Sequence, residues 1–129
     1  MLPFTVSLRP GEPIHDQVVY AVTRAVMSGQ LRAGDAFPSV RALSQELRIN
    51  PNTAHKIVAT LVDQGLLQVR PGIGTVVGDG RDAGSAERRA VLDRDAERLA
   101  VEAKRVGLAL QEVIAAIRRH WAKTVRRTG

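Results

Sequence analysis

The chain reads PSVRALSQELRINPNTAHK over residues 38–56, and this stretch predicts two short helices joined by a tight turn. Ser39 is suited to cap the first helix, because apolar residues follow it at helical spacing. Asn50 offers a side-chain oxygen to the free N–H groups of the second helix. Pro51 fits the first helical position because its missing N–H is not needed there. The sequence therefore predicts a second helix that begins at Pro51.

The N-terminal part of this second helix carries four side chains that can donate hydrogen bonds, Asn52, Thr53, His55 and Lys56. Arg41 lies early in the first helix of the pair. A helix presented in this way is how helix-turn-helix proteins enter the major groove of DNA. We therefore expect double-stranded DNA to be the partner. The alternative for each of these residues is a solvated surface side chain.

Segments on both sides complete a winged helix-turn-helix over residues 1–78. The spacing of apolar residues predicts a helix over residues 14–28, and the helix from Pro51 should end near Gln64. Two β-rich runs, 66–70 and 75–77, flank a Gly/Pro turn and predict a β-hairpin. The expected fold class is thus mainly α with a small β-hairpin. Residues expected to face the core of the helices are Ile14, Val18, Val22, Val26, Val40, Leu43, Leu47, Ile57, Val58, Leu61 and Val62.

The second part of the chain predicts a linker followed by a two-helix tail. Residues 79–85 are polar and contain two glycines, a composition typical of a linker or hinge. A helix is expected over residues 86–106, ended by Gly107, and a second helix follows it. The tail region is therefore residues 86–125, and its last residues should fray.

Each tail helix has one apolar stripe, and two helices alone cannot close a core. The remaining apolar surface must be covered by the winged domain or by a second chain. Helix-turn-helix modules commonly bind DNA as two-fold dimers, so we expect a homodimer. The residues expected to form the dimer interface are Leu92, Leu99, Leu110, Val113, Ile114, Ile117 and Trp121.

Composition sets the remaining bounds on this chain of 129 residues with a net charge of +6. The positive excess lies more in the tail than in residues 1–78, so charge alone does not identify a DNA binder. The absence of cysteine excludes disulfides and thiolate chemistry. No apolar run approaches the roughly 20 residues that span a bilayer, and no secretory signal is present. We expect a cytoplasmic protein without a membrane partner.

Catalytic and metal-binding patterns are weak. His15, His55 and His120 are scattered without metal-ligand spacing, so no metal site is expected. Residues 72–78 superficially suggest a glycine-rich phosphate loop, but a linker and not a helix follows them. There is no cysteine nucleophile, no plausible Ser-His-acid set and no pair of carboxylates in an apolar pocket. The sequence predicts that the protein is not an enzyme and needs no cofactor.

Several strings of the chain, taken in order, resemble the GntR family of bacterial transcription regulators. The resemblance covers roughly residues 13–78. Its strings are PIHDQ (13–17), SGQL (28–31), GD (34–35), PSVR (38–41), NT (52–53), GLL (65–67) and GIGT (72–75). The short remainder and the string INPNT at 49–53 resemble the YtrA-type subgroup. This resemblance implies a dimeric repressor, often of nearby transporter genes and of its own operon.

The resemblance also implicates individual residues in DNA contact: Arg41, Asn52, Thr53, His55 and Gly72. Gly72 lies where the tip of the wing would approach the minor groove by its backbone. Lys56 is expected, from its place on the helix, to neutralise a phosphate.

The sequence departs from the wider family at several positions. Pro51 and His55 stand where many members have arginines that read guanine, so the preferred operator can differ. Arg48 stands where a turn glycine is usual, which would strain the backbone if φ is positive there. Ala109 replaces a capping serine, which would weaken the start of the last helix by about 1 kcal/mol.

The leading hypothesis is a sequence-specific transcriptional regulator that represses as a homodimer on an inverted-repeat operator. The alternative is a protein–protein interaction module that uses the winged helix without specific DNA binding. A small-molecule effector, if there is one, would sit between the tail and the winged domain or across the dimer. The sequence identifies neither the effector nor the operator.

Overall fold

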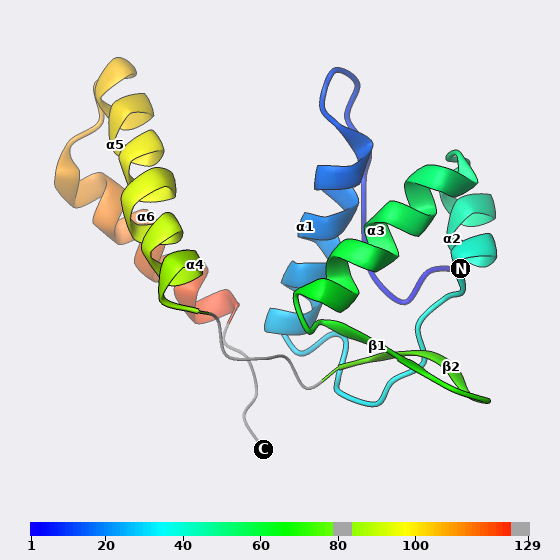
Figure 1. Ribbon diagram of the computed structural model, residues 1–129. Coiled ribbons are helices and arrows are strands. Elements are labelled where there is room, and N and C mark those ends of the chain that lie inside the picture. Colours follow the sequence, from blue (N-terminus) through cyan, green and yellow to red (C-terminus); the bar gives the residue numbers. More distant parts are fainter. Residues whose placement is uncertain (79–83, 125–129) are drawn as a thin grey trace. The chain divides into compact units, whose positions relative to one another are not determined.

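The computed structural model describes residues 1–78 and 84–124, and the chain divides into two compact units (Figure 1). We call residues 1–78 the winged unit and residues 84–123 the tail unit. Most of the expected linker lies outside the described residues. Ser85, which was expected in the linker, is the first residue of a helix.

The winged unit has the element order expected from the sequence, three helices and then a hairpin. Its fold is mainly helical with a two-stranded antiparallel sheet, which confirms the expected fold class. The elements are α1 (Ile14–Met27), α2 (Val40–Leu47), α3 (Pro51–Asp63), β1 (Leu67–Arg70) and β2 (Gly74–Val77). Helix α3 packs against α1, α2 and β1, so it is the central element of this unit.

The hairpin is extended on one side by the connector between α1 and α2. β1 and β2 pair antiparallel, with Leu67 opposite Val77. Backbone hydrogen bonds join the connector to β2: the Phe37 N–H donates to the Thr75 carbonyl at 2.9 Å. The Val77 N–H donates to the Asp35 carbonyl at 2.8 Å. The connector therefore fixes the hairpin to the helical part of the unit.

Aliphatic side chains form the core of the winged unit. The largest fully buried ones include Leu43, Ile57, Leu61 and Leu67. The N-terminal segment joins this core through Phe4, whose ring stacks on Phe37 with centroids 5.7 Å apart. Val40 and Leu47 are only partly buried.

Two residues expected in the core are exposed. Ile14 is 40% exposed because it lies in the first turn of α1, where the chain enters the helix. Val62 is 38% exposed because it follows Leu61, and a helix turns about 100° with each residue. The expected positions of both side chains were therefore wrong.

The turn between α2 and α3 is closely held. The Ser39 side chain accepts a hydrogen bond from the Ala42 N–H at 3.1 Å and so caps α2. The Asn50 side chain accepts one from the Asn52 N–H at 2.7 Å and caps α3. Between these caps, Arg48 adopts φ 55° and ψ 49°. Arg48 therefore has the positive φ at which an arginine is strained.

The tail unit contains two helical arms. The first arm comprises α4 (Ser85–Ala90), a π-helical turn (Val91–Asp95) and α5 (Ala96–Arg105); the second is α6 (Leu110–Lys123). A single regular helix was expected over residues 86–106, and the π-helical turn interrupts it. The start of α6 retains one side-chain cap, because the Ala109 N–H donates to Glu112 Oε2 at 2.8 Å. No helix in the described part of the chain is long and apolar enough to cross a membrane.

We expect Asn50→Ala to lower the free energy of unfolding by about 1 kcal/mol, because α3 loses its side-chain cap. Denaturant unfolding at fixed protein concentration measures this change. Asn52→Ala is the matched control, because the Asn52 side chain is exposed and makes no hydrogen bond to the described residues. Equal losses of stability in the two variants would contradict the capping role of Asn50.

Candidate nucleic-acid interface

Helix α3 has one buried side and one exposed side. Ala54, Ile57, Val58 and Leu61 face the core. The other side is exposed at Asn52, His55 and Lys56, and Thr53 is half-buried beside them. The first turn of α3 therefore presents polar side chains outward, while its later turns hold the helix in the core.

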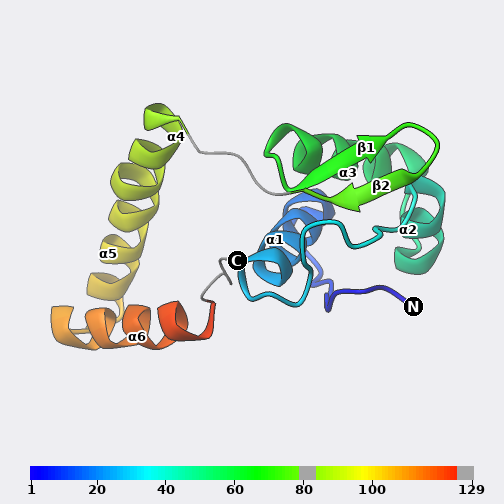
Figure 2. The same ribbon diagram turned by 90° about the horizontal axis from the view of Figure 1, so that it is seen from below.

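The predicted DNA-contacting residues of the two helices belong to neighbouring elements. Arg41 lies in the first turn of α2, which packs on α3, and it is exposed. Gly72 lies apart from these residues, at the tip of the hairpin. Figures 1 and 2 show that the hairpin tip and the α2–α3 turn lie on the same side of the winged unit, away from α1.

Three cations of the helix-turn-helix have no ion-pair partner among residues 1–78 and 84–124. Within the described part of the chain, the side chains of Arg41, Arg48 and Lys56 make neither a hydrogen bond nor an ion pair. Glu46, the only acidic residue of α2, is engaged with the N-terminal ammonium group of Met1 at 2.6 Å. The three cations are thus available to a polyanion.

The hairpin tip combines a permissive backbone with exposed apolar side chains. Gly72 has φ +77°, and a β-carbon there would meet no atom within 4 Å, so conformation and not space favours glycine. Val69 and Ile73 are 63% and 72% exposed. These two residues were missed in the sequence, where the only sign was two aliphatic residues close to a Gly/Pro turn. A tip of this kind suits contact with a partner surface.

Helix α1 contributes support for α3. His15 Nε2 lies 2.9 Å from Thr60 Oγ1, and the Thr60 hydroxyl donates to the Lys56 carbonyl at 2.9 Å. His15 Nδ1 also contacts Asp16 Oδ1 at 3.0 Å. The contact between His15 and Thr60 therefore ties the start of α1 to the C-terminal half of α3.

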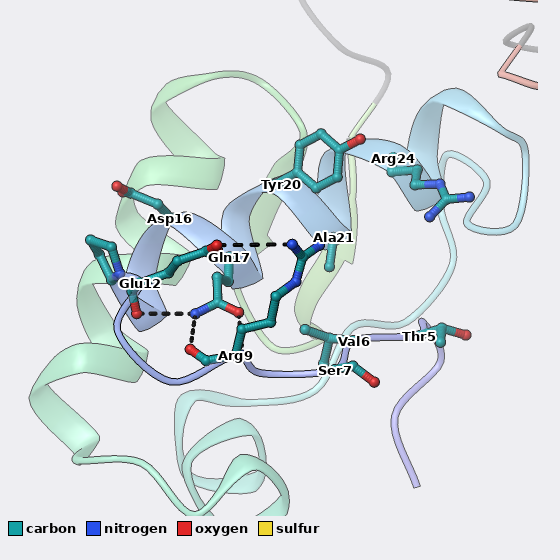
Figure 3. Close-up of a pocket in the computed structure, with 11 residues that line it drawn as sticks. Thr5, Val6, Ser7, Arg9, Glu12, Asp16, Gln17, Tyr20, Ala21 and Arg24 are labelled. Atoms are coloured by element: carbon teal, nitrogen blue, oxygen red, sulfur yellow. Dashed lines mark hydrogen bonds and ion pairs between the residues drawn. The ribbon is translucent and has the colours of Figure 1, made fainter. Parts of the chain in front are cut away.

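A second concave region of the winged unit lies between the N-terminal segment and α1 (Figure 3). Its volume is about 510 Å³. The Gln17 side chain accepts a hydrogen bond from the Arg9 N–H and donates to the Arg9 and Glu12 carbonyls. Arg9 also pairs with Glu12 at 3.8 Å. These polar groups mainly hold the turn before α1, so the groove is a weaker candidate for a ligand site.

The tail unit has an apolar groove between α5 and α6 with a volume of about 280 Å³. Of the residues expected in the dimer interface, five line this groove: Leu99, Leu110, Val113, Ile114 and Ile117. Leu92 and Trp121 lie outside it and are largely exposed. Among residues 1–78 and 84–124 there is no cluster of His, Asp or Glu that could hold a metal ion.

Comparisons with known proteins agree on the family and the fold. Residues 14–77 match the family described as "Bacterial regulatory proteins, gntR family". The chain is 26% identical over 106 residues to the HTH-type transcriptional repressor YtrA of Bacillus subtilis, covering 81% of this chain and 82% of that protein.

Two solved structures share the fold over most of the chain. One, described as a transcriptional antiterminator from Listeria monocytogenes EGD-e, has a TM-score of 0.76 at 23% identity and covers 91% of this chain and 88% of that one. The other, YtrA from Sulfolobus acidocaldarius, has a TM-score of 0.54 at 24% identity and covers 92% of this chain and 97% of that one.

The three helices, the hairpin and the outward first turn of α3 define a winged helix-turn-helix protein with a C-terminal helical part. Such domains are DNA-binding modules and not enzymes. The chain belongs to the GntR family and is a transcriptional regulator of the YtrA type, with repressors among its relatives.

Proposed function

We propose that the protein is a sequence-specific repressor that binds an inverted-repeat operator as a homodimer. Each of the two copies places the first turn of α3 in the major groove and the hairpin tip toward the adjacent minor groove. The observation that carries this proposal is the capped first turn of α3, which is exposed and bordered by uncompensated cations. That surface offers hydrogen-bond donors and positive charge together, as a DNA duplex requires.

Different side chains of this surface contact different parts of the DNA. Asn52, Thr53 and His55 face base edges, where an Asn that pairs bidentately with adenine is worth about 1–3 kcal/mol of discrimination. Arg41 and Lys56 bind phosphates and fix the register of the protein on the duplex. Gly72 lets the wing backbone approach the DNA, and Ile73 adds an apolar contact in the minor groove.

The tail unit joins the two copies. Its α5–α6 groove is lined by aliphatic residues, and Trp121, which is 73% exposed, extends the apolar surface along α6. Burying such a surface against an identical copy is a favourable way to remove it from water. Joined in this way, two reading helices match the two half-sites of an inverted repeat.

The resemblance to YtrA-type regulators also suggests where the repressor acts, which genes it controls and how it is regulated. The repressor acts in the cytoplasm, and its target is an operon that includes transporter genes. A small-molecule effector that binds across the dimer controls it. The competing function is a protein–protein interaction module, which the exposed Val69 and Ile73 of the hairpin tip would also suit.

We expect Arg41→Ala to keep the melting temperature of the wild type and to weaken binding to a genomic fragment selected by the wild-type protein. The loss should be about 10- to 150-fold, since a hydrogen bond to a charged group contributes about 1.5–3 kcal/mol and about 1.4 kcal/mol is a factor of ten. Gel retardation over a range of salt concentrations measures it. Arg24→Ala, which removes a cation from α1, is the control and should bind like the wild type. Unchanged binding by Arg41→Ala, or no retarded fragment even at low salt, would favour the interaction module.

We expect Ile114→Glu to convert the homodimer into a monomer, because the charge would enter the groove between α5 and α6. Sedimentation analysis of the full chain measures the change, and operator affinity should fall with it. Val101→Glu is the matched control, because Val101 is exposed on α5 and does not line the groove. A wild-type chain that sediments as a monomer at all concentrations would refute the homodimer.

A further inference from the structure

Arg48, in the turn between α2 and α3, has a backbone conformation that disfavours its own side chain. Its φ of 55° and ψ of 49° lie in the left-handed helical region. It is the one non-glycine residue with positive φ among residues 1–78 and 84–124. A β-carbon in this region approaches the following carbonyl oxygen, so glycine, and to a lesser extent asparagine, is preferred there. The stability of the fold alone therefore favours glycine over Arg48.

The turn holds Arg48 in this conformation from both sides. The Ile49 N–H donates to the Ser44 carbonyl at 3.1 Å, and the Ser44 hydroxyl donates to the Ile49 carbonyl at 2.8 Å. Ser44 is itself buried. The Asn50 cap follows directly and fixes the start of α3. Relaxing Arg48 would break this set of hydrogen bonds and displace the first turn of α3.

No contact of the Arg48 side chain with the described residues offsets this strain. The side chain is exposed and makes no hydrogen bond or ion pair with the described residues. Glu46, the nearest acidic residue in the sequence, is already paired with the N-terminal ammonium group. When a residue is strained and its side chain makes no contact within the protein, binding to another molecule can offset the free-energy cost of the strain.

The position of Arg48 suggests the chemistry of that partner. Arg48 follows the last residue of α2 and lies two residues before the cap of α3, so it belongs to the same helix-turn-helix as the exposed cations Arg41 and Lys56. The guanidinium carries a positive charge at the end of a long side chain, and such a charge binds a phosphate oxygen. A DNA backbone that passes the first turn of α3 presents such oxygens along its length.

We propose that Arg48 is a phosphate-binding residue that positions the first turn of α3 on DNA, and that the chain gives up stability at this turn to keep it. This inference rests on the proposed function, since the phosphate belongs to the duplex that α3 reads. If Arg48 has this role, replacing it with glycine raises the stability of the protein and lowers its affinity for DNA. Replacing an ordinary surface arginine would not have these two opposite effects.

The test compares Arg48→Gly, Arg48→Asn and Arg48→Lys in the full chain, with thermal melting and DNA binding measured on each. Arg48→Gly and Arg48→Asn should melt roughly 2–5 °C higher than the wild type, because both relieve the strain. Both should bind the selected fragment about tenfold more weakly. The slope of log K against log salt should fall by about 0.9 for each bound copy. Arg48→Lys should melt like the wild type and retain most of the affinity and the slope.

The outcomes separate this inference from the function on which it rests. Wild-type affinity and salt slope in Arg48→Gly, with Arg41→Ala impaired, would overturn the role of Arg48 and leave the proposed function standing. Equal weakening in Arg48→Lys and Arg48→Gly would also overturn it, because the charge would then not be what matters. A wild-type chain that binds no DNA would overturn both. Arg24→Ala, which removes a cation from α1, controls for net charge and should match the wild type in every measurement.

Discussion

The hydrogen bonds between Ser44 and Ile49 hold the turn on which the rest of the winged unit depends. They close α2 and set the direction in which the chain leaves toward Asn50. Because Asn50 then caps α3, the buried and exposed sides of that helix are fixed together. A turn that relaxed would expose Ile57 and Leu61 or withdraw the first turn of α3 from the surface. One small set of bonds therefore couples the stability of the core to the presentation of the helix.

The rest of the unit supports this helix from three sides. Helix α1 contacts it through His15 and Thr60, β1 follows it after Gly65, and α2 packs against it. The chain has few aromatic residues, and two of them, Phe4 and Phe37, stack on each other in the core. Their contact holds the N-terminal segment against the connector beside β2. These contacts hold the buried side of α3 in place, while the exposed side of its first turn stays free to bind a partner.

Sequence reasoning predicted the elements whose signals are local. The caps at Ser39 and Asn50 and the Gly/Pro turn of the hairpin each specify structure over a few residues, and all are present. The pairing of Asp35 and Phe37 with β2 is a long-range contact with no local signal, so the sequence did not predict it. Val62 was misplaced because an apolar residue next to a core position need not itself be buried.

Only part of the candidate site could be predicted from the sequence, again because only some of its residues have a local signal. Residues on α2 and α3 could be named because a helix-turn-helix fixes their places by sequence alone, and their contact with DNA stays a prediction. The apolar hairpin tip of Val69 and Ile73 could not be named, because aliphatic residues near a turn are equally compatible with burial. The usual glycine of the family only raised the question of a positive φ at Arg48. The value of φ, and the lack of a side-chain partner among the described residues, are visible only in the structure.

The central claim is that the first turn of α3 is open in the free protein and covered by DNA in the complex. The chain contains no cysteine, so His55→Cys introduces a single thiol directly after that turn, and Tyr20→Cys places one on the exposed surface of α1 (Figure 3). The measurement is the alkylation rate of each variant, free and with enough DNA to retard all of the protein. We expect rapid alkylation of both free variants and protection by DNA of His55→Cys alone. Slow alkylation of free His55→Cys, or an unchanged rate when DNA is bound, would contradict the central claim.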